Sequence, residues 1–264
     1  IEASVWAFGR GKESWLVEHR VLMGDTARET VWKRLAEMLA ETWTHASGAA
    51  MPLVRFALDT GFATQEAYAF VRACRDSRVM AVKGVPRGAA LIGTPTAIDV
   101  SQGGKKLRRG IKVYSVAVSI AKLEFYNNLR KSADVGEDGL TTVFPAGFVH
   151  LPKIDAEFIQ QLCAEQLITR RDRNGFPVRE WQKMRERNEA LDCYVYARAA
   201  ASAAGLDRFE ERHWRELERQ LGLASPPALE TPTESINEAT QRRGLAVSGN
   251  RNTGRRVIKS RWLS

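Results

Sequence analysis

The sequence has few cysteines, few histidines and no long apolar run, and each shortage excludes a class of protein. Its 264 residues include three cysteines and four histidines. Cys74, Cys163 and Cys193 are widely spaced with no second ligand nearby, so they fit neither a disulfide framework nor a zinc knuckle. No apolar stretch approaches the roughly 18 residues of a membrane-spanning helix, and no signal-peptide pattern is present. We therefore expect a soluble, intracellular protein with reduced cysteines and no membrane partner.

Acidic residues are also outnumbered by basic ones. Forty lysines and arginines against 31 aspartates and glutamates give a formal net charge of +9. This balance favours a polyanionic partner, with nucleic acid as the first candidate. Hydrophobic residues make up 44% of the chain, which is enough for a sizeable core in one domain of about 200 residues.

Strand and helix patterns alternate along the first 220 residues. Period-two runs predict strands at 2–9, 14–22, 53–58 and 79–84. Apolar residues at helical spacing predict helices at 25–39, 64–71, 120–129 and 156–168. The Gly- and Lys-rich stretch 86–110 has little periodicity and predicts a loop. The order indicates an α/β fold.

The C-terminal end has a different composition. From Ser225 onward the chain is rich in Pro, Thr, Ser, Asn and Arg, with few apolar residues to form a core. We predict one domain over residues 1–222 and a flexible basic tail over residues 223–264.

Two aspartates stand out as candidate catalytic residues. Asp59 ends the run 53–58 and is followed by Thr60-Gly61, so it lies at a strand end, where side chains of α/β sheets face the ligand crevice. Asp192 lies within an otherwise apolar, small-residue helical segment, with Glu189 one turn before it. The alternatives are a turn residue for Asp59 and a solvated helical carboxylate for Asp192.

Basic residues occur near both aspartates and predict contacts to nucleic-acid phosphates. The predicted DNA-binding residues are Lys83, Lys105, Lys106, Arg108, Arg109 and Arg187. A solvated charged face is the alternative. The segment Gly103-Gly104-Lys105-Lys106 lacks the spacing of a phosphate-binding Walker A loop.

Several short segments, in this order and spacing, resemble the C-terminal nuclease half of the large terminase subunit of tailed bacteriophages of the lambda type. They are Asp59-Thr60-Gly61 and residues 79–84, 147–152, 179–183 and 187–193. The resemblance runs from the first residue to about Gly205 and implies a ribonuclease-H-like mixed sheet flanked by helices. It also implies an endonuclease that cuts concatemeric viral DNA during packaging, in the host cell cytoplasm.

The resemblance gives the aspartates a role in two-metal phosphodiester hydrolysis, in which carboxylates from different elements converge on two ions. Asp59 and Asp192 are then catalytic metal ligands, and Glu189 is either a further ligand, a residue that orders its neighbour, or a solvated acid. Hard oxygen ligands favour Mg²⁺, with Mn²⁺ as a substitute. The implied partners are double-stranded viral DNA, the small terminase subunit and the procapsid portal.

One departure from the family pattern affects the expected activity. The family carries its first metal-binding aspartate on a first strand, just before a hairpin like residues 2–22, and that strand is expected upstream of the present sequence. The sequence therefore leaves open whether this segment alone cleaves DNA. The alternative function is a non-catalytic DNA-binding or procapsid-docking module in which both aspartates are incidental.

Overall fold

A computed structural model gives the structure for residues 1–102 and 105–223, without the side chains of residues 100–102, 105–107 and 109. The predicted tail, residues 223–264, lies outside the described residues apart from Leu223. In the described part of the chain, no helix has the length and apolar character needed to cross a membrane.

The largest sheet has the strand order β5-β6-β8-β7. Its strands are β5 (Phe56–Asp59), β6 (Val79–Val85), β7 (Thr96–Gln102) and β8 (Lys105–Ala117). The first three in spatial order are parallel, and β7 runs antiparallel to β8. Helix α2 (Thr64–Cys74) makes the crossover from β5 to β6. The continuous buried run Met80-Ala81-Val82 fits a strand that is covered on both faces.

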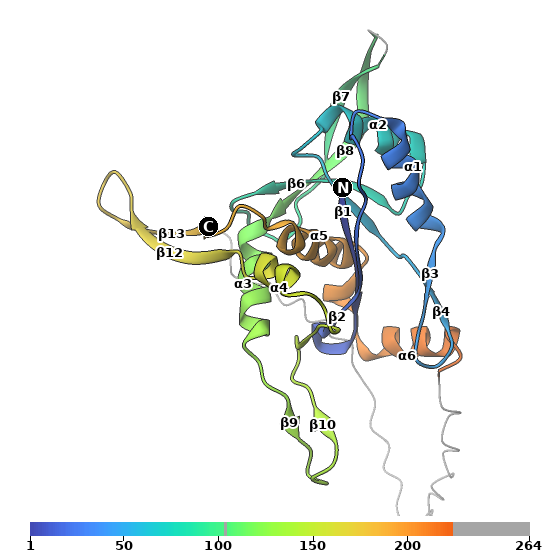
Figure 1. Cartoon of the computed structure of the whole chain (residues 1–264), viewed down its shortest axis with the longest axis vertical. Helices are drawn as coiled ribbons and strands as arrows, with labels where there is room; N and C mark the ends of the chain where they lie inside the picture. The colour runs from blue at the N-terminus through green and yellow to red at the C-terminus, as the bar shows by residue number, and fades with distance from the viewer. Residues whose placement is uncertain (103–104, 224–264) are drawn as a thin grey trace, which may run out of the picture. The chain divides into compact units, whose positions relative to one another are not determined.

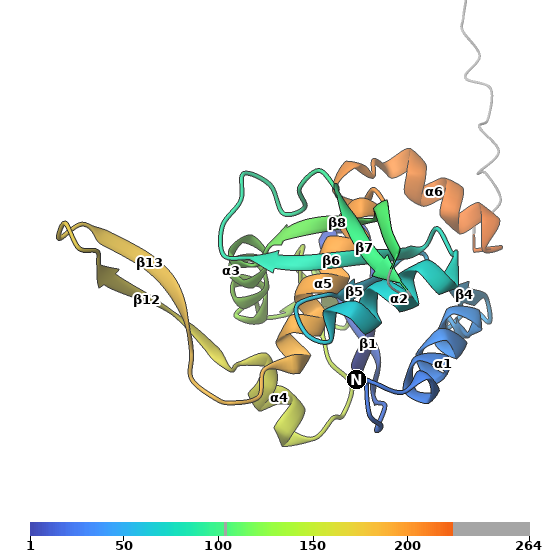
Figure 2. The same cartoon turned by 90° about the horizontal axis from the view of Figure 1, so that it is seen from above.

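A second sheet has the order β1-β2-β11. Strands β1 (Glu2–Phe8) and β2 (Ser14–Val21) form the predicted hairpin around the 3₁₀ turn Arg10–Lys12, and β11 (Val149–His150) runs parallel to β2. Three two-stranded hairpins complete the strands: β3 (Thr42–Thr44) with β4 (Ala50–Pro52), β9 (Asp134–Val135) with β10 (Thr142–Val143), and β12 (Glu165–Arg171) with β13 (Pro177–Lys183). Both views show the β12–β13 hairpin extending away from the sheets (Figures 1 and 2).

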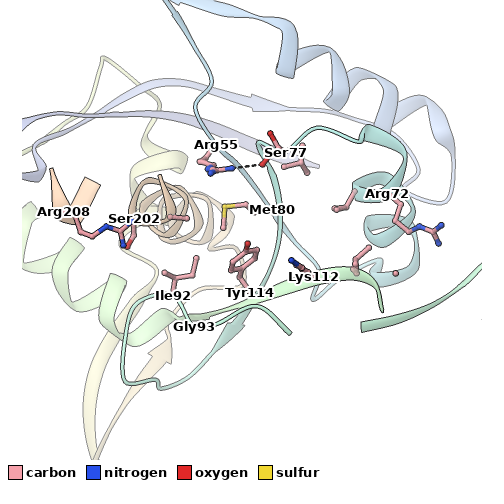
Figure 3. A pocket seen from close by; sticks show the side chains of 15 residues that line it. Arg55, Arg72, Ser77, Met80, Ile92, Gly93, Lys112, Tyr114, Ser202 and Arg208 are labelled. Atoms are coloured by element: carbon pink, nitrogen blue, oxygen red, sulfur yellow. Dashed lines mark hydrogen bonds between the residues drawn. The ribbon is translucent and has the colours of Figure 1, made fainter. Parts of the chain in front are cut away.

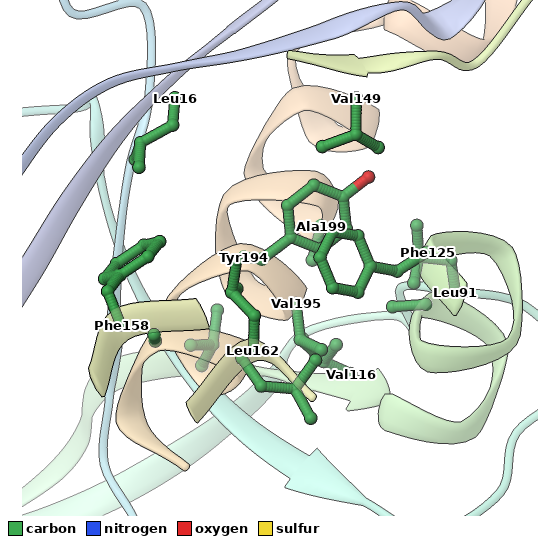
Figure 4. Packing of buried hydrophobic residues seen from close by; sticks show 14 of the residues in the cluster. Leu16, Leu91, Val116, Phe125, Val149, Phe158, Leu162, Tyr194, Val195 and Ala199 are labelled. Atoms are coloured by element: carbon green, nitrogen blue, oxygen red, sulfur yellow. The ribbon is translucent and has the colours of Figure 1, made fainter. Parts of the chain in front are cut away.

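Helix α5 (Glu189–Ala203) lies against strands of both sheets, β1 and β5. Its Leu191, Tyr194, Val195 and Ala199 are buried in the main core (Figure 4). The other helices are α1 (Glu29–Glu37), α3 (Val118–Leu129), α4 (Ala156–Leu162) and α6 (Glu211–Gln220), with short 3₁₀ turns at Met38–Ala40 and Leu206–Arg208. The many alanines of α5 allow backbones to approach closely, so this helix can pack on all sides.

A second core lies on the other face of β5. Val31 and Leu35 of α1 and Phe70 of α2 pack there with Val5 of β1 and Leu58 of β5. The strands β1 and β5 therefore contribute side chains to one apolar cluster although they belong to different sheets. Burial of this kind contributes about 1.5–3 kcal/mol for each large apolar side chain.

The prediction of an α/β fold is confirmed, but two predicted elements are wrong. Residues 86–110 are not one loop, because β7 and the first part of β8 pair within them as an antiparallel ladder. Residues 156–168 are not one helix, because α4 ends at Leu162 and β12 begins at Glu165. In both places the strand pairs with the strand that follows it in the chain, and the hydrogen bonds of this hairpin override the local residue pattern.

Candidate active site

Asp59 lies at the carboxyl end of β5, as the sequence predicts, with its Cα paired to Val82 of β6. The turn after it is held by hydrogen bonds: the Gly61 N–H donates to Asp59 Oδ1 at 3.0 Å, and the buried Thr60 hydroxyl donates to the Val82 carbonyl at 2.9 Å. Ala63 follows in the left-handed region, at φ 46°, where a non-glycine residue is strained. The carboxylate of Asp59 is thereby fixed at the sheet edge while the residue stays exposed.

Asp192 lies on the first turn of α5 and is half-buried. Burial raises the pKa of its carboxyl to about 6, with further upward contributions from the charges of Glu165 and Asp59, against the lowering effects of Lys122 and Lys183. Asp59 and Asp192 thus lie close enough for the negative charge of one to oppose ionisation of the other. The structure brings together the two residues that the sequence singles out.

Tyr196 lies one helical turn after Asp192, with its hydroxyl beside Asp59. Its hydroxyl donates a hydrogen bond to Asp59, and burial, followed by the charges of Asp59 and Asp192, holds the pKa of the phenol well above its usual range. A Cβ placed on Gly84 would come within 2.9 Å of the Tyr196 Oη, so the glycine makes room for the ring. Sequence reasoning missed Tyr196, although its spacing of four residues from Asp192 puts both on one helix face.

A buried ion pair lies next to Asp192. Lys122 of α3 donates from Nζ to both carboxylate oxygens of Glu165, at 2.6 and 2.7 Å, and the two side chains are 8% and 7% exposed. Asn188, the residue before α5, donates to the same carboxylate at 3.0 Å. Glu165 therefore links α3, the start of β12 and the start of α5, and it is a third carboxylate beside Asp192 that the sequence did not indicate.

Glu189 has a different set of neighbours. Its Oε2 lies 3.4 Å from Nε of Arg187, which also forms an ion pair with Glu2 of β1. The structure thus places Glu189 beside Arg187 and Glu2, and its role as a ligand stays a prediction.

The predicted DNA-binding residues are scattered. Lys83 is exposed and follows Val82 at the end of β6, near Asp59, whereas the charge of Arg187 is shared between two carboxylates. Arg108 is exposed on β8, and the side chains of Lys105, Lys106 and Arg109 lie outside the described ones. Lys183, at the end of β13, is a further basic residue of the segment before α5, and its charge acts on Asp192. DNA binding by these residues stays a prediction.

The two aspartates suit a hard divalent cation. Carboxylate oxygens are the donors that Mg²⁺ prefers, and Mg²⁺ usually keeps several waters and takes only one or two protein carboxylates. The raised pKa of Asp192 reflects burial and negative charge that a cation between the carboxylates would offset. Within residues 1–102 and 105–223, no group of three or more His, Cys, Asp or Glu side chains is arranged to hold a metal ion. Asp59 and Asp192 are therefore the described residues that would hold the cation.

Comparison with known proteins gives a consistent family match. The family model "Terminase large subunit gpA, endonuclease domain" matches residues 1–214. The large terminase subunit of Escherichia phage lambda is 32% identical over 205 residues, and that of Enterobacteria phage P21 is 30% identical over 202 residues. Each alignment covers 75% of this chain and 30% of the relative, so the chain matches less than a third of their length. No solved structure matches.

Proposed function

Because this chain belongs to the endonuclease-domain family of the large terminase subunit gpA, we propose that it cuts double-stranded viral DNA during packaging by metal-dependent phosphodiester hydrolysis. The observation that carries the proposal is the approach of Asp59 and Asp192, from a strand end and a helix, with Tyr196 hydrogen-bonded to Asp59 and within reach of the charge of Asp192. Carboxylates from separate elements that converge at a strand end are the ligand arrangement that such hydrolysis needs.

Asp59 and Asp192 would hold Mg²⁺ or Mn²⁺, which when bound supplies positive charge to the attacking and leaving oxygens of the phosphodiester, with two ions in a two-metal site. Tyr196 orients the Asp59 carboxylate through its hydrogen bond. The buried Lys122–Glu165 ion pair lies near Asp192 and stabilises the structure around it. Lys83 and Lys183, near the two carboxylates, would attract the phosphate backbone.

The finer fold proposal is a ribonuclease-H-like mixed sheet. We propose that a further strand, the one that carries the first aspartate in the family pattern, pairs between β1 and β5. Three observations support it: α5 lies against both strands, Val5 and Leu58 share one core, and among the described residues β1 pairs only with β2 and β5 only with β6. Such a strand would join the two sheets into one.

The fold proposal makes a stability prediction. A protein extended upstream by the family's first-strand segment should melt several degrees higher than residues 1–264, because the added strand pairs with two open edges. Differential scanning fluorimetry of both proteins measures the difference. A matched extension with the same composition in scrambled order is the control, and an equal rise for both would contradict the placement of the strand.

The nuclease proposal is tested by nicking of supercoiled plasmid. The upstream-extended protein should nick DNA in the presence of Mg²⁺ or Mn²⁺, and nicking should stop when EDTA is added. DNA binding without nicking under any metal condition would instead favour the alternative, a non-catalytic DNA-binding or procapsid-docking module. Within the whole terminase, we propose the small subunit and the procapsid portal as partners, in the host cell cytoplasm.

The DNA contacts make a prediction about salt dependence. Replacing Lys83 and Lys183 together by glutamate should weaken binding to random duplex DNA and flatten the slope of log K against log salt by about 2, since each phosphate contact contributes about 0.9. Fluorescence anisotropy at several salt concentrations measures the slope. The control exchanges Arg130 and Lys153, two exposed residues outside the site, for glutamate. An equal loss in both variants would mean that only net charge matters.

A further inference from the structure

A pocket of about 620 Å³ lies at the opposite end of β5 from Asp59 (Figure 3). It is lined by residues just before β5, at the start of β6, in the middle of β8 and at the end of α5. Arg55 on its rim precedes β5 by one residue, and Asp59 ends that strand, so four residues at about 3.3 Å each separate them by roughly 13 Å. The pocket is therefore distinct from the carboxylate site.

Four cationic side chains line this pocket: Arg55, Arg72, Lys112 and Arg208. No acidic residue lines it, and within the described part of the chain none of the four has a carboxylate within ion-pair distance. Arg72 Nη1 is buried without a hydrogen-bond partner, and Arg55 donates to the Ser77 carbonyl, a neutral acceptor. Cations spread around one pocket without a counter-charge give it a positive potential, and a bound anion lowers that potential.

The floor of the pocket is apolar. Met80, Ile92 and Tyr114 lie between the cations in Figure 3 and belong to the main core or pack against it. The Tyr114 ring is half-buried, and Ser202 lies at the edge with its hydroxyl donating to Asp207. The volume falls within the roughly 300–1,000 Å³ that small-ligand sites occupy. A charged rim over an aromatic and aliphatic floor suits a ligand with an anionic end and a flat apolar body.

From this combination we propose that the pocket binds a nucleotide, with its phosphate on cations of the rim, Lys112 and Arg208 among them, and its base on the floor formed by Met80, Ile92 and Tyr114. The nucleotide comes either from solution or as one unit of a single DNA strand, and both present the same phosphate and base. This second site needs no metal and does not depend on the proposed cleavage. It adds a nucleotide contact on the end of the sheet away from the two aspartates.

The test is a calorimetric titration in EDTA with inorganic phosphate, deoxyadenosine monophosphate and a short single-stranded oligothymidylate. The Lys112→Gln/Arg208→Gln variant should lose at least about tenfold in affinity, because two charge-assisted hydrogen bonds are removed. The control is Arg130→Gln/Lys153→Gln, which removes the same charge elsewhere and should bind as the unchanged protein does. Both lining residues are exposed, so melting temperatures of the two variants should agree.

Each outcome decides the proposal. Binding of the mononucleotide that the pocket variant weakens and the control retains supports a free-nucleotide site, and the same pattern with the oligonucleotide alone supports a strand contact. Absence of binding to all three probes, equal loss in both variants, or phosphate binding as tight as nucleotide binding overturns the nucleotide assignment. An Asp192→Asn variant should keep full nucleotide affinity, which separates this site from a failure of the nuclease proposal.

Discussion

Replacing Asp192 by asparagine should abolish metal-dependent nicking and raise the melting temperature at pH 8. Nicking should fall by at least about 100-fold, since even residues that only support metal ligands contribute 10–100-fold. Stability should rise because burial, Glu165 and Asp59 raise the pKa of Asp192 to about 6, so its ionised form is unfavourable in the metal-free fold. The shift corresponds to about 2–3 kcal/mol, or roughly 4–10 °C for a domain of this size.

The pH dependence of this effect has a definite sign. A carboxyl whose pKa is higher in the folded than in the unfolded state favours folding when protonated, so the unchanged protein should gain stability as the pH falls through about 6. The Asp192→Asn variant lacks this gain, and the two melting curves should converge near pH 4. An Asp134→Asn variant, at an exposed position of β9, is the control. Lower stability with nicking preserved would remove Asp192 from the site.

Replacing Lys122 by methionine should be the most destabilising single change at the site. Glu165 would then be 7% exposed and without its cation, and a broken buried ion pair costs about 3–5 kcal/mol. The melting temperature should fall by roughly 10 °C. The pKa of Asp192 should also rise further, because the Lys122 charge lowers it in the unchanged protein.

The double variant Lys122→Met/Glu165→Gln tests this explanation. It removes both charges and leaves an amide that can still accept from Asn188, so most of the lost stability should return. Thermal melts of the two single variants and the double variant form a cycle that isolates the pair. If the double variant is no more stable than Lys122→Met, the loss comes from packing around the lysine stem.

The sequence is sufficient to locate Asp59 and Asp192, because each depends on a local signal. A strand that ends in Asp-Thr-Gly and a carboxylate within a small-residue helix are visible without knowing the partner elements. Glu165 carries no such signal, since its role depends on Lys122, 43 residues earlier in the chain. The stretch 86–110 shows a different limit, because β7 and β8 pair as neighbouring strands although their glycine- and lysine-rich composition is typical of a loop.

The basic pocket was likewise beyond sequence reasoning. Three of its cations come from separate segments of the chain, at Arg55, Lys112 and Arg208. In the sequence, each of them alone is typical of an ordinary surface charge. Only the fold brings them over the same apolar floor. By contrast, the family resemblance rests on short segments in order, and the match over residues 1–214 confirms it.

The position of α5 against both β1 and β5 also determines how the site moves. A helix buried against two sheets cannot open locally without exposing both cores, so its backbone amides exchange with solvent mainly through global unfolding. Asp59, on a four-residue strand that ends in a strained turn, belongs to a region where local opening is less costly. The helix therefore acts as the fixed reference of the site, and the position of Asp59 depends on the hydrogen bonds of Thr60 and Gly61 in its own turn.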